Sequence, residues 1–265
     1  MPALSFLHAE VARREPSGPV GLVRIAVGLG VVIKLLDIAP KLWRTTDPQV
    51  LLLPYFEGLG RPTPLIVLAL LALGTVAALL FLAGWGGRTP GFVLTGVLGA
   101  VLALDQQLYS NHLYLLTLLV ALLTLAGAGR AVSLDARHGR GGGTVPGWPL
   151  TLLRWQLTLL YLFAALSKLN PTFLSGAVLV EQLPRFAAYP DVLRWASWLG
   201  LALEAWLALG LWWPRTRRWT VVLGVLFHST VLLFMVPKAE LLVFGLVSLG
   251  LYRLFFPAVD REPAA

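Results

Sequence analysis

The sequence carries a lysine near the end of a long apolar segment, in the string Tyr161-Leu-Phe-Ala-Ala-Leu-Ser-Lys168-Leu-Asn-Pro-Thr-Phe173-Leu-Ser-Gly176. That apolar segment covers residues 148–169 and is long enough to cross a bilayer as a helix. Lysine is otherwise rare in the chain, occurring only at positions 34, 41 and 238. An ammonium at the edge of a bilayer is costly to hold and easy to deprotonate. Lys168 is therefore either an anchor at the interface or a working base.

The whole chain has the composition of a membrane protein. It has 265 residues, of which 57% are hydrophobic and 13% are charged, and its mean hydropathy is +0.78. A soluble domain of this size carries about twice that share of charge. We predict an all-α fold, a polytopic transmembrane helical bundle of about eight spans, at about 20–38, 63–85, 90–107, 111–128, 148–169, 194–213, 217–236 and 239–256. We expect residues 1–265 to form a single transmembrane domain, with no soluble domain.

The basic residues favour an orientation with both termini in the cytoplasm. In that orientation the inner segments hold ten arginines, namely Arg13, Arg14, Arg88, Arg130, Arg137, Arg140, Arg215, Arg217, Arg218 and Arg261. The outer segments hold five basic residues, namely Lys41, Arg44, Arg61, Arg185 and Lys238. This bias agrees with the positive-inside rule. The net charge of +8 is thereby explained by loops between spans, so we expect no nucleic-acid partner.

Several kinds of catalytic site are disfavoured by the sequence. The chain has no cysteine, which excludes thiol catalysis and thiolate metal sites. His112 and His228 are separated in the sequence and in predicted depth, and no His-Glu-x-x-His pattern occurs, so we expect no metal. No serine lies in a Gly-x-Ser-x-Gly turn, which argues against a serine hydrolase.

Ionisable residues inside predicted spans are candidates for function. Glu204 and His228 lie near the middle of their spans, and we expect both to face the bundle interior. They form either a structural hydrogen-bonded pair or the floor of a pocket. Arg24 either reaches the interface as an anchor or pairs inside the bundle. Lys34 and Asp37 share a helix face, which predicts a local ion pair.

A further set of polar residues gathers at predicted hairpins on the outer side, where Lys168 also ends. Its members are Asp105, Gln106, Gln107, Asn111 and His112 at one hairpin and Lys238 and Glu240 at the last. An imidazole can orient an amine and exchange protons with it. The set is either a functional site around Lys168 or a group of polar helix ends in contact with water.

The string around Lys168 resembles the transmembrane domain of vitamin K-dependent gamma-glutamyl carboxylase, which is shared with bacterial HTTM (horizontally transferred transmembrane) proteins. The matching residues are Tyr161, Ala164, Lys168-Leu169, Phe173 and Gly176. Three other strings are similar to family motifs and keep the family's order over residues 20–256, namely Leu22-Val-Arg24-Ile-Ala-Val-Gly28, Asn111-His112-Leu-Tyr114-Leu115 and Phe227-His228. The chain departs from the pattern at Ala165, Thr172 and Phe173, where the family has glycine, often an acid, and tryptophan.

The resemblance implies roles for individual residues. Lys168 becomes the base that deprotonates vitamin K or menaquinone hydroquinone, and His112 becomes its partner. Supporting roles in binding the quinol fall to Asn111, Tyr114, Tyr161, Glu204 and His228. Oxygen then converts the quinol to an epoxide, and carbon dioxide adds to a deprotonated glutamate or another small carbon acid.

The resemblance also implies a setting and leaves alternatives open. We expect an integral protein of the bacterial plasma membrane, with its site facing outward and in contact with membrane lipids and quinone. The carboxylase's luminal domain has no counterpart in this sequence, so a separate soluble partner would have to replace it. The alternative is a quinone- or lipid-binding membrane subunit that does not carboxylate. A small transporter is the third hypothesis, and the lack of an evident internal repeat argues against it.

Overall fold

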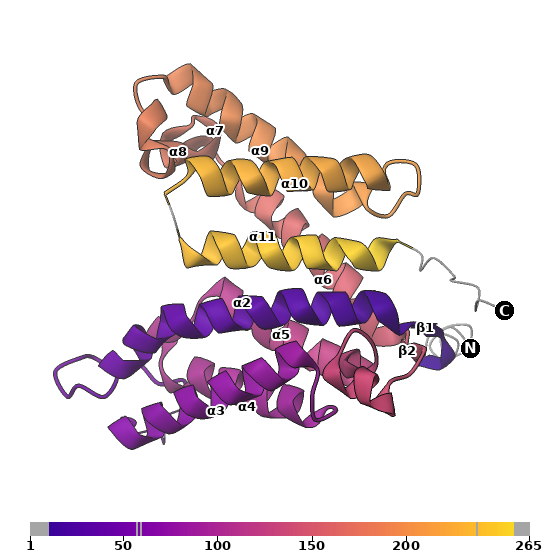
Figure 1. Ribbon diagram of the computed structural model, residues 1–265. Coiled ribbons are helices and arrows are strands. Elements are labelled where there is room, and N and C mark those ends of the chain that lie inside the picture. Colours follow the sequence, from indigo (N-terminus) through magenta and orange to yellow (C-terminus); the bar gives the residue numbers. More distant parts are fainter. Residues whose placement is uncertain (1–10, 57, 59, 237, 257–265) are drawn as a thin grey trace, which may run out of the picture. The chain divides into compact units, whose positions relative to one another are not determined.

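The computed structural model describes residues 11–56, 58, 60–236 and 238–256. Arg261, one of the arginines assigned to the inner side, lies outside the described residues. The chain divides into two compact units: unit 1 consists of residues 1–152 with 256–265, and unit 2 of residues 153–255. Both units are helical where they are described (Figure 1). The single transmembrane domain stays a prediction.

Unit 1 contains four long helices, α2 (Ser17–Arg44), α3 (Pro64–Ala83), α4 (Thr89–Leu104) and α5 (Asn111–Ala126). Each packs against the next in the chain, and α2 also packs against α5, which closes the four into a bundle (Figure 1). The short helices are η1 (Gln106–Leu108), η2 (Ala128–Arg130) and η3 (Ala136–Arg140). Strands β1 (Arg14–Pro16) and β2 (Thr144–Pro146) pair antiparallel. The all-α prediction did not include this small ribbon.

Local sequence explains where the helices of unit 1 begin and end. At the start of α3, the hydroxyl of Thr63 accepts a hydrogen bond from the backbone N–H of Ile66. At the start of α5, Ser110 does the same for Leu113. Both helices end on a glycine in the left-handed conformation, Gly84 with φ of 66° and Gly127 with φ of 72°. Such glycines let the chain turn so that the last backbone carbonyls find donors.

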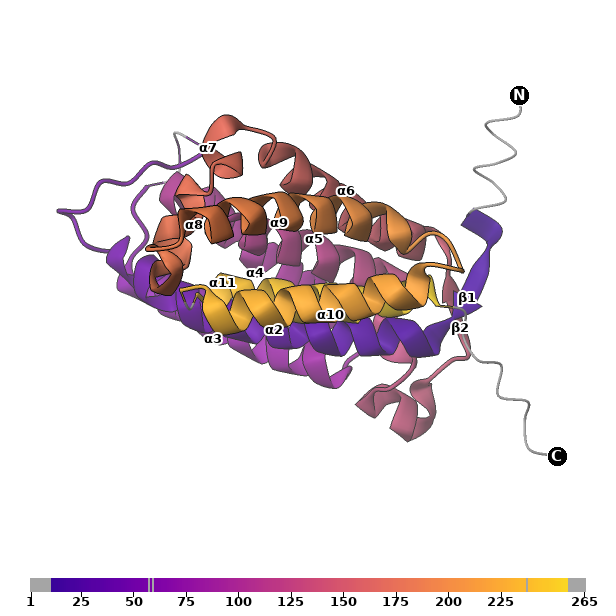
Figure 2. The ribbon, with the colours of Figure 1, turned by 90° about the horizontal axis from the view of Figure 1, so that it is seen from above.

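Unit 2 contains the larger part of α6 (Trp148–Ser167), then α9 (Pro190–Gly210), α10 (Arg217–Phe234) and α11 (Ala239–Tyr252). Its short helices are α7 (Pro171–Leu174), α8 (Ala177–Gln182), η4 (Pro184–Phe186) and η5 (Arg253–Phe255). Helix α10 packs against both α9 and α11. The short α7 and α8 pack against α9 near its first residues (Figure 2).

The prediction of a largely helical chain is confirmed, and the eight long helices of the described residues each overlap one of the eight predicted ranges. Four of them, α3, α6, α9 and α10, are long and apolar enough to cross a membrane, while α4 and α5 are shorter apolar helices. Apolar side chains on α3 point outward, as lipid contact requires: Leu65 is 75% exposed. The number of spans and the side on which the termini lie stay predictions.

We expect Gly91→Ala to destabilise unit 1, because a Cβ at this position of α4 would overlap the Thr124 hydroxyl on α5. Overpacking of this kind costs about 1–3 kcal/mol. Gly96→Ala is the matched control, since it lies on the same helix and its Cβ would meet nothing within 4 Å. Thermal unfolding in detergent measures both. Equal melting temperatures for the two variants would contradict the close packing of α4 on α5.

Candidate functional site

The central contact of unit 2 is an ion pair between Lys168 and Glu204. Lys168 directly follows the last residue of α6, and its Nζ donates a hydrogen bond of 2.5 Å to Oε2 of Glu204 on α9. The same Nζ donates to the backbone carbonyl of Ala164 at 3.3 Å. Glu204 is 5% exposed, whereas 22% of the Lys168 side chain is exposed. A buried carboxylate is strongly disfavoured without a partner, and Lys168 supplies one.

The contact between Lys168 and Glu204 was not predicted from the sequence. The sequence placed this lysine at the rim of the bilayer and Glu204 near the middle, yet the two atoms are in hydrogen-bond contact. Glu204 lies fourteen residues after Pro190, the first residue of α9, which is about 21 Å along the helix axis. Lys168 is therefore level with the interior of α9. The physical reason is that Asn170-Pro171 ends α6, and the chain continues past Lys168 as α7 and α8.

Two residues of the string around Lys168 hold the segment that follows it. Gly176 has a φ of 88°, and a Cβ there would collide with the backbone of Leu193 and Arg194 on α9. Only glycine allows this approach without strain. The Asn170 side-chain oxygen accepts from the N–H of Phe173 at 2.8 Å and so caps α7. The Phe173 ring then lies with its centroid 5.5 Å from Nζ of Lys168, within cation–π range.

A second polar cluster is built around Tyr161, which lies two helical turns before Lys168 on the same face of α6. The Tyr161 hydroxyl lies 2.7 Å from Nε2 of His228 on α10 and 2.6 Å from the hydroxyl of Tyr252 on α11. All three side chains are buried. The ring of Phe244 packs edge-on against Tyr161 and His228, at centroid distances of 5.8 Å and 5.0 Å. Helix α6 therefore presents one polar face to three other helices.

The expectation that Glu204 and His228 are buried is confirmed, with exposures of 5% and 2%. They do not form the hydrogen-bonded pair with each other that one reading predicted. Glu204 bonds to Lys168, and His228 bonds to Tyr161. The difference arises because polar side chains on neighbouring helices pair according to helix rotation, which distance along the sequence does not determine.

The two clusters have distinct chemical capacities. The Lys168–Glu204 pair joins an amine and a carboxylate, so a proton can reside on either partner. In the second cluster, Tyr161 can donate to His228 while it accepts from Tyr252, or donate to Tyr252 while it accepts from the imidazole. Because the donors and acceptors in this chain of hydrogen bonds can exchange roles, the chain can transfer a proton as well as hold the helices together.

Sequence reasoning missed Tyr252, Phe244 and Ser248, which all lie on α11. Tyr252 stands near the end of an apolar span, where aromatic residues are common for other reasons. Ser248 lies one turn before Tyr252 on the same helix face, and its side chain is buried. The spacing of Ser248 and Tyr252 in an otherwise apolar helix was the available signal.

The other predicted site residues, Asn111, His112 and Tyr114, belong to unit 1, where they open helix α5. The Asn111 side-chain oxygen accepts a hydrogen bond of 3.0 Å from the Tyr109 hydroxyl, and Tyr114 is about half exposed. Tyr109 and Tyr114 lie with their ring centroids 6.3 Å apart. That His112 assists Lys168 stays a prediction.

Part of the predicted polar cluster at this hairpin has a structural role. The carboxylate of Asp105 accepts from the backbone N–H groups of Leu53 and Gln107 at 3.2 and 3.1 Å. The Gln107 side chain donates to the carbonyl of Leu51 at 2.7 Å. These bonds tie the loop after α2 to the turn between α4 and α5. Asp105 and Gln107 are thus accounted for without a ligand.

Two predictions for α2 have clear outcomes. Lys34 Nζ and Asp37 Oδ2 are 2.8 Å apart, which confirms the local ion pair. Arg24 is 2% exposed and donates to backbone carbonyls inside unit 1, which agrees with the alternative that it pairs inside the bundle. Among the described residues, no group of three or more His, Asp or Glu side chains is arranged to hold a metal ion.

The strings around Arg24, His112, Lys168 and His228 are all included in one family match. A model of the HTTM domain matches residues 13–258. The chain belongs to the HTTM family. HTTM is the transmembrane domain of vitamin K-dependent carboxylase. Together with its apolar helices, this membership identifies an integral membrane protein. No curated protein and no solved structure matches the chain.

A double-mutant cycle should show strong coupling between Lys168 and Glu204 in this HTTM protein. Lys168→Met leaves the Glu204 carboxylate buried without its partner, and losing one member of a buried pair costs about 3–5 kcal/mol. We expect Lys168→Met with Glu204→Gln to be less destabilised than the sum of the single variants. Chemical unfolding in detergent gives the four free energies. Simple additivity would show that the contact contributes nothing to folding.

Tyr161→Phe should destabilise the HTTM bundle, because the hydroxyl serves both His228 and Tyr252. Leaving buried polar groups unsatisfied costs about 1–3 kcal/mol. Tyr189→Phe is the matched control, since Tyr189 is 60% exposed. We expect its melting temperature to equal that of the unchanged protein. A Tyr161→Phe variant as stable as Tyr189→Phe would contradict a structural role for this cluster.

Proposed function

We propose that this HTTM protein binds a quinol of the vitamin K or menaquinone type and that Lys168 removes a proton from its hydroxyl group. The observation that carries the proposal is the 2.5 Å contact between Lys168 Nζ and Glu204 Oε2. It joins the lysine of the family string to a buried carboxylate that can take a proton from it. Membership of the family that includes the carboxylase's transmembrane domain supports the same reading.

The pair explains how a lysine can act as a base here. A proton moves from the Lys168 ammonium to Oε2 of Glu204, which leaves a neutral amine beside a carboxylic acid. Two neutral groups are cheaper to keep out of water than an uncompensated charge, so a buried setting makes this transfer accessible. The amine then accepts the hydroxyl proton of the quinol and becomes an ammonium again. Glu204 holds the displaced proton until it is released.

The groups around Lys168 fit a quinol. A quinol combines a flat aromatic ring with hydroxyl donors, and unit 2 offers an aromatic face at Phe173 beside the Lys168 amine. About a fifth of the Lys168 side chain is accessible. Apolar side chains exposed on α6, among them Phe163 and Leu166, are compatible with approach of a lipophilic molecule through the bilayer. When bound, a quinol would supply the four electrons needed to reduce dioxygen, as it is converted to the quinone epoxide.

The complete reaction that we propose is carboxylation of a small carbon acid, with glutamate as the first candidate. One quinol, one dioxygen, one carbon dioxide and one C–H acid give one quinone epoxide, one carboxylic acid and one water. The quinol is oxidised and dioxygen is reduced, while the C–H bond of the acid is replaced by a C–C bond to carbon dioxide. We assign Tyr161, Glu204 and His228 to the support of the site in unit 2. We further propose that His112 assists Lys168, with Asn111 and Tyr114 beside it.

We place this activity in a bacterial plasma membrane, with the site facing outward. Membrane lipids and quinone are the expected small-molecule partners. A separate soluble protein would present the carbon acid, in place of the luminal domain found in the carboxylase. The excess of arginine on the predicted inner segments supports the orientation.

A second function is favoured by the same ion pair. Glu204 neutralises Lys168, so the contact also makes sense as a static element of a quinone- or lipid-binding subunit that performs no carboxylation. In that case the chain would retain quinone for a partner enzyme. Mass spectrometry of lipids that copurify with the protein distinguishes this function when it is combined with the activity assay below.

We expect the reconstituted protein, given reduced menaquinone, oxygen, labelled bicarbonate and glutamate, to form quinone epoxide and fixed label. Lys168→Ala should reduce both products to background, because it removes the base. Lys41→Ala is the matched control, since Lys41 is an exposed lysine on α2, and it should retain full activity. Chromatography of the quinone and counting of fixed label give the two readouts.

The outcomes separate the two functions. Retained quinone without epoxide or fixed label would support the binding subunit and contradict the carboxylase. Equal loss of activity in Lys168→Ala and Lys41→Ala would contradict the assignment of Lys168 as the base. If folded protein neither retains quinone nor turns it over, both functions are excluded.

A further inference from the structure

Arg24 holds two loops of unit 1 together from the inside. Its Nη1 donates to the carbonyl of Ala128 at 3.0 Å, and its Nη2 donates to those of Leu82 and Val132 at 3.3 and 2.7 Å. Leu82 lies in the last turn of α3, so the cation meets the negative end of that helix dipole, and Ala128 is the first residue of η2 after α5. The remaining donor, Nε, is buried and has no hydrogen-bond partner.

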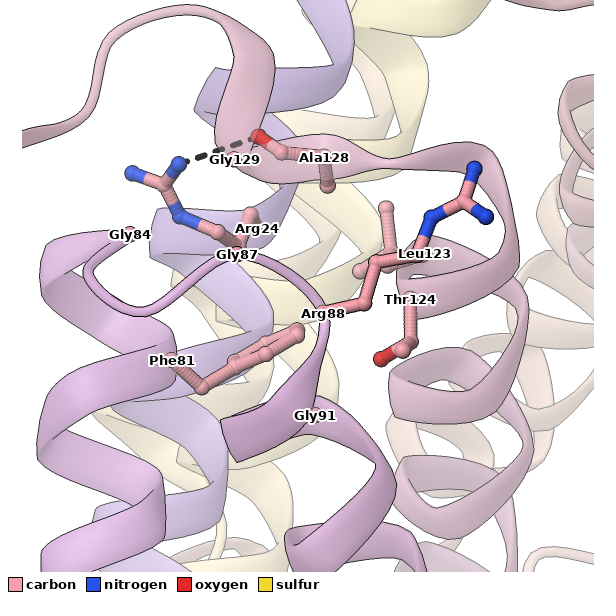
Figure 3. A pocket seen from close by; sticks show the side chains of 10 residues that line it. All are labelled: Arg24, Phe81, Gly84, Gly87, Arg88, Gly91, Leu123, Thr124, Ala128 and Gly129. Atoms are coloured by element: carbon pink, nitrogen blue, oxygen red, sulfur yellow. Dashed lines mark hydrogen bonds between the residues drawn. The ribbon is translucent and has the colours of Figure 1, made fainter. Parts of the chain in front are cut away.

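An unsatisfied buried donor in a folded protein calls for a partner such as a water molecule or an ion. Arg24 lines a small recess that is open at its mouth and has enclosed room for about one water-sized group, such as a single phosphate oxygen. Figure 3 shows the guanidinium groups of Arg24 and Arg88 on opposite sides of this recess. We call it the arginine recess, and its lining consists of Arg24, Phe81, Gly84, Gly87, Arg88, Gly91, Leu123, Thr124, Ala128 and Gly129.

The arginine recess is electropositive. Its lining has two arginines and no carboxylate. The nearby Asp135 is already engaged, because its Oδ2 accepts from the N–H of Gly87 at 2.7 Å and its Oδ1 lies 3.2 Å from Nη2 of Arg140. Arg88 is exposed and donates one bond, to the Leu125 carbonyl at 3.2 Å. A guanidinium has five N–H donors, so Arg88 can donate to a ligand as well.

The start of α4 adds to this field. Helix α4 begins at Thr89 directly after Arg88, and no side chain caps its first turn. The backbone N–H groups of Thr89 and Gly91 in this turn have no partner within the helix and favour an anion, whereas Pro90 has no N–H. Gly91, in that first turn, lines the arginine recess. Arg24, Arg88 and Gly91 in the uncapped first turn of α4 thus line one recess.

We propose that the arginine recess binds the phosphate group of an anionic membrane lipid. One phosphate oxygen accepts from the buried Nε of Arg24, and Arg88 supplies charge-assisted hydrogen bonds at the mouth. Both loops that form the recess belong to the predicted inner side, where anionic lipids concentrate and where basic pockets between helices bind their head groups. The site lies wholly within unit 1 and does not depend on the reaction proposed for Lys168.

The test uses the full chain in detergent with phosphatidylglycerol and phosphatidylcholine in equal amounts, and native mass spectrometry of the retained lipid. We expect the unchanged protein to retain phosphatidylglycerol in preference. Arg88→Gln should weaken that retention by about fivefold, because one arginine at an anionic surface has an effect of this size. Arg137→Gln is the matched control: it removes the same charge from an exposed arginine that does not line the recess.

A second variant keeps every charge and narrows the space. A Cβ at Gly129 would meet only the carbonyl of Gly87, at 3.7 Å, so Gly129→Val should be accommodated while its side chain fills the mouth. We expect it to lose phosphatidylglycerol as Arg88→Gln does. Retained helicity and an unchanged elution volume would show that both variants are folded.

Three results would overturn the proposal. Equal retention of the two lipids would mean that only water satisfies Arg24. Equal losses in Arg88→Gln and Arg137→Gln would reduce the effect to diffuse surface charge. Unchanged retention in Gly129→Val would place the lipid elsewhere. A last arm adds inorganic phosphate alone and measures the melting temperature of the protein. A rise in melting temperature equal to the rise with phosphatidylglycerol, and absent in Arg88→Gln, would support the phosphate site but contradict a lipid as its source.

Discussion

Hydrocarbon cannot solvate a charge, so each buried charge of this chain must find its counterpart within the protein. Glu204 has Lys168, and Lys34 has Asp37. Arg24 has no carboxylate in direct contact and is held by backbone carbonyls at the end of α3 and in the segment after α5. These contacts explain why a chain with so few charged residues keeps several of them buried, and the Lys168–Glu204 pair also joins two helices, α6 and α9.

In unit 2, the need of buried polar groups for partners also determines how the residues around Lys168 are arranged. Lys168–Glu204 joins α6 to α9, and the Tyr161 hydroxyl joins α6 to α10 and α11. The two clusters lie on one face of α6, two turns apart, so the rotation that satisfies one also satisfies the other. The segment α7–α8 then covers the start of α9 through the close approach at Gly176. A lysine held in this way keeps its amine in one place, as a site for proton transfer requires.

Much of the fold follows from the length of apolar runs, and the eight predicted ranges match eight helices because hydrophobic length is a strong local signal. The helices α7 and α8 were not predicted, since short elements packed on another helix have no such signal. At the site, the ionisable side chains identified Lys168, Glu204 and His228, and the resemblance to the family string identified Tyr161; unit 2 contains all four. Their partners were not predictable, because pairing depends on helix rotation and on where α6 stops. Tyr252 was missed because its place at a span end looked ordinary.

The ion pair is the contact on which the proposed role of Lys168 as a base depends. An anchor at the interface needs water at its ammonium, but Nζ contacts a carboxylate that is 5% exposed and lies well along α9. Glu204 supplies the negative charge that stabilises the Lys168 ammonium beside the middle part of α9. Its Oε2, which accepts the hydrogen bond from Nζ, is also placed to take the proton. Structural and chemical roles therefore depend on one contact. A lysine without Glu204 would be either expelled toward water or permanently neutral, and in neither state could it cycle between amine and ammonium beside a lipophilic substrate.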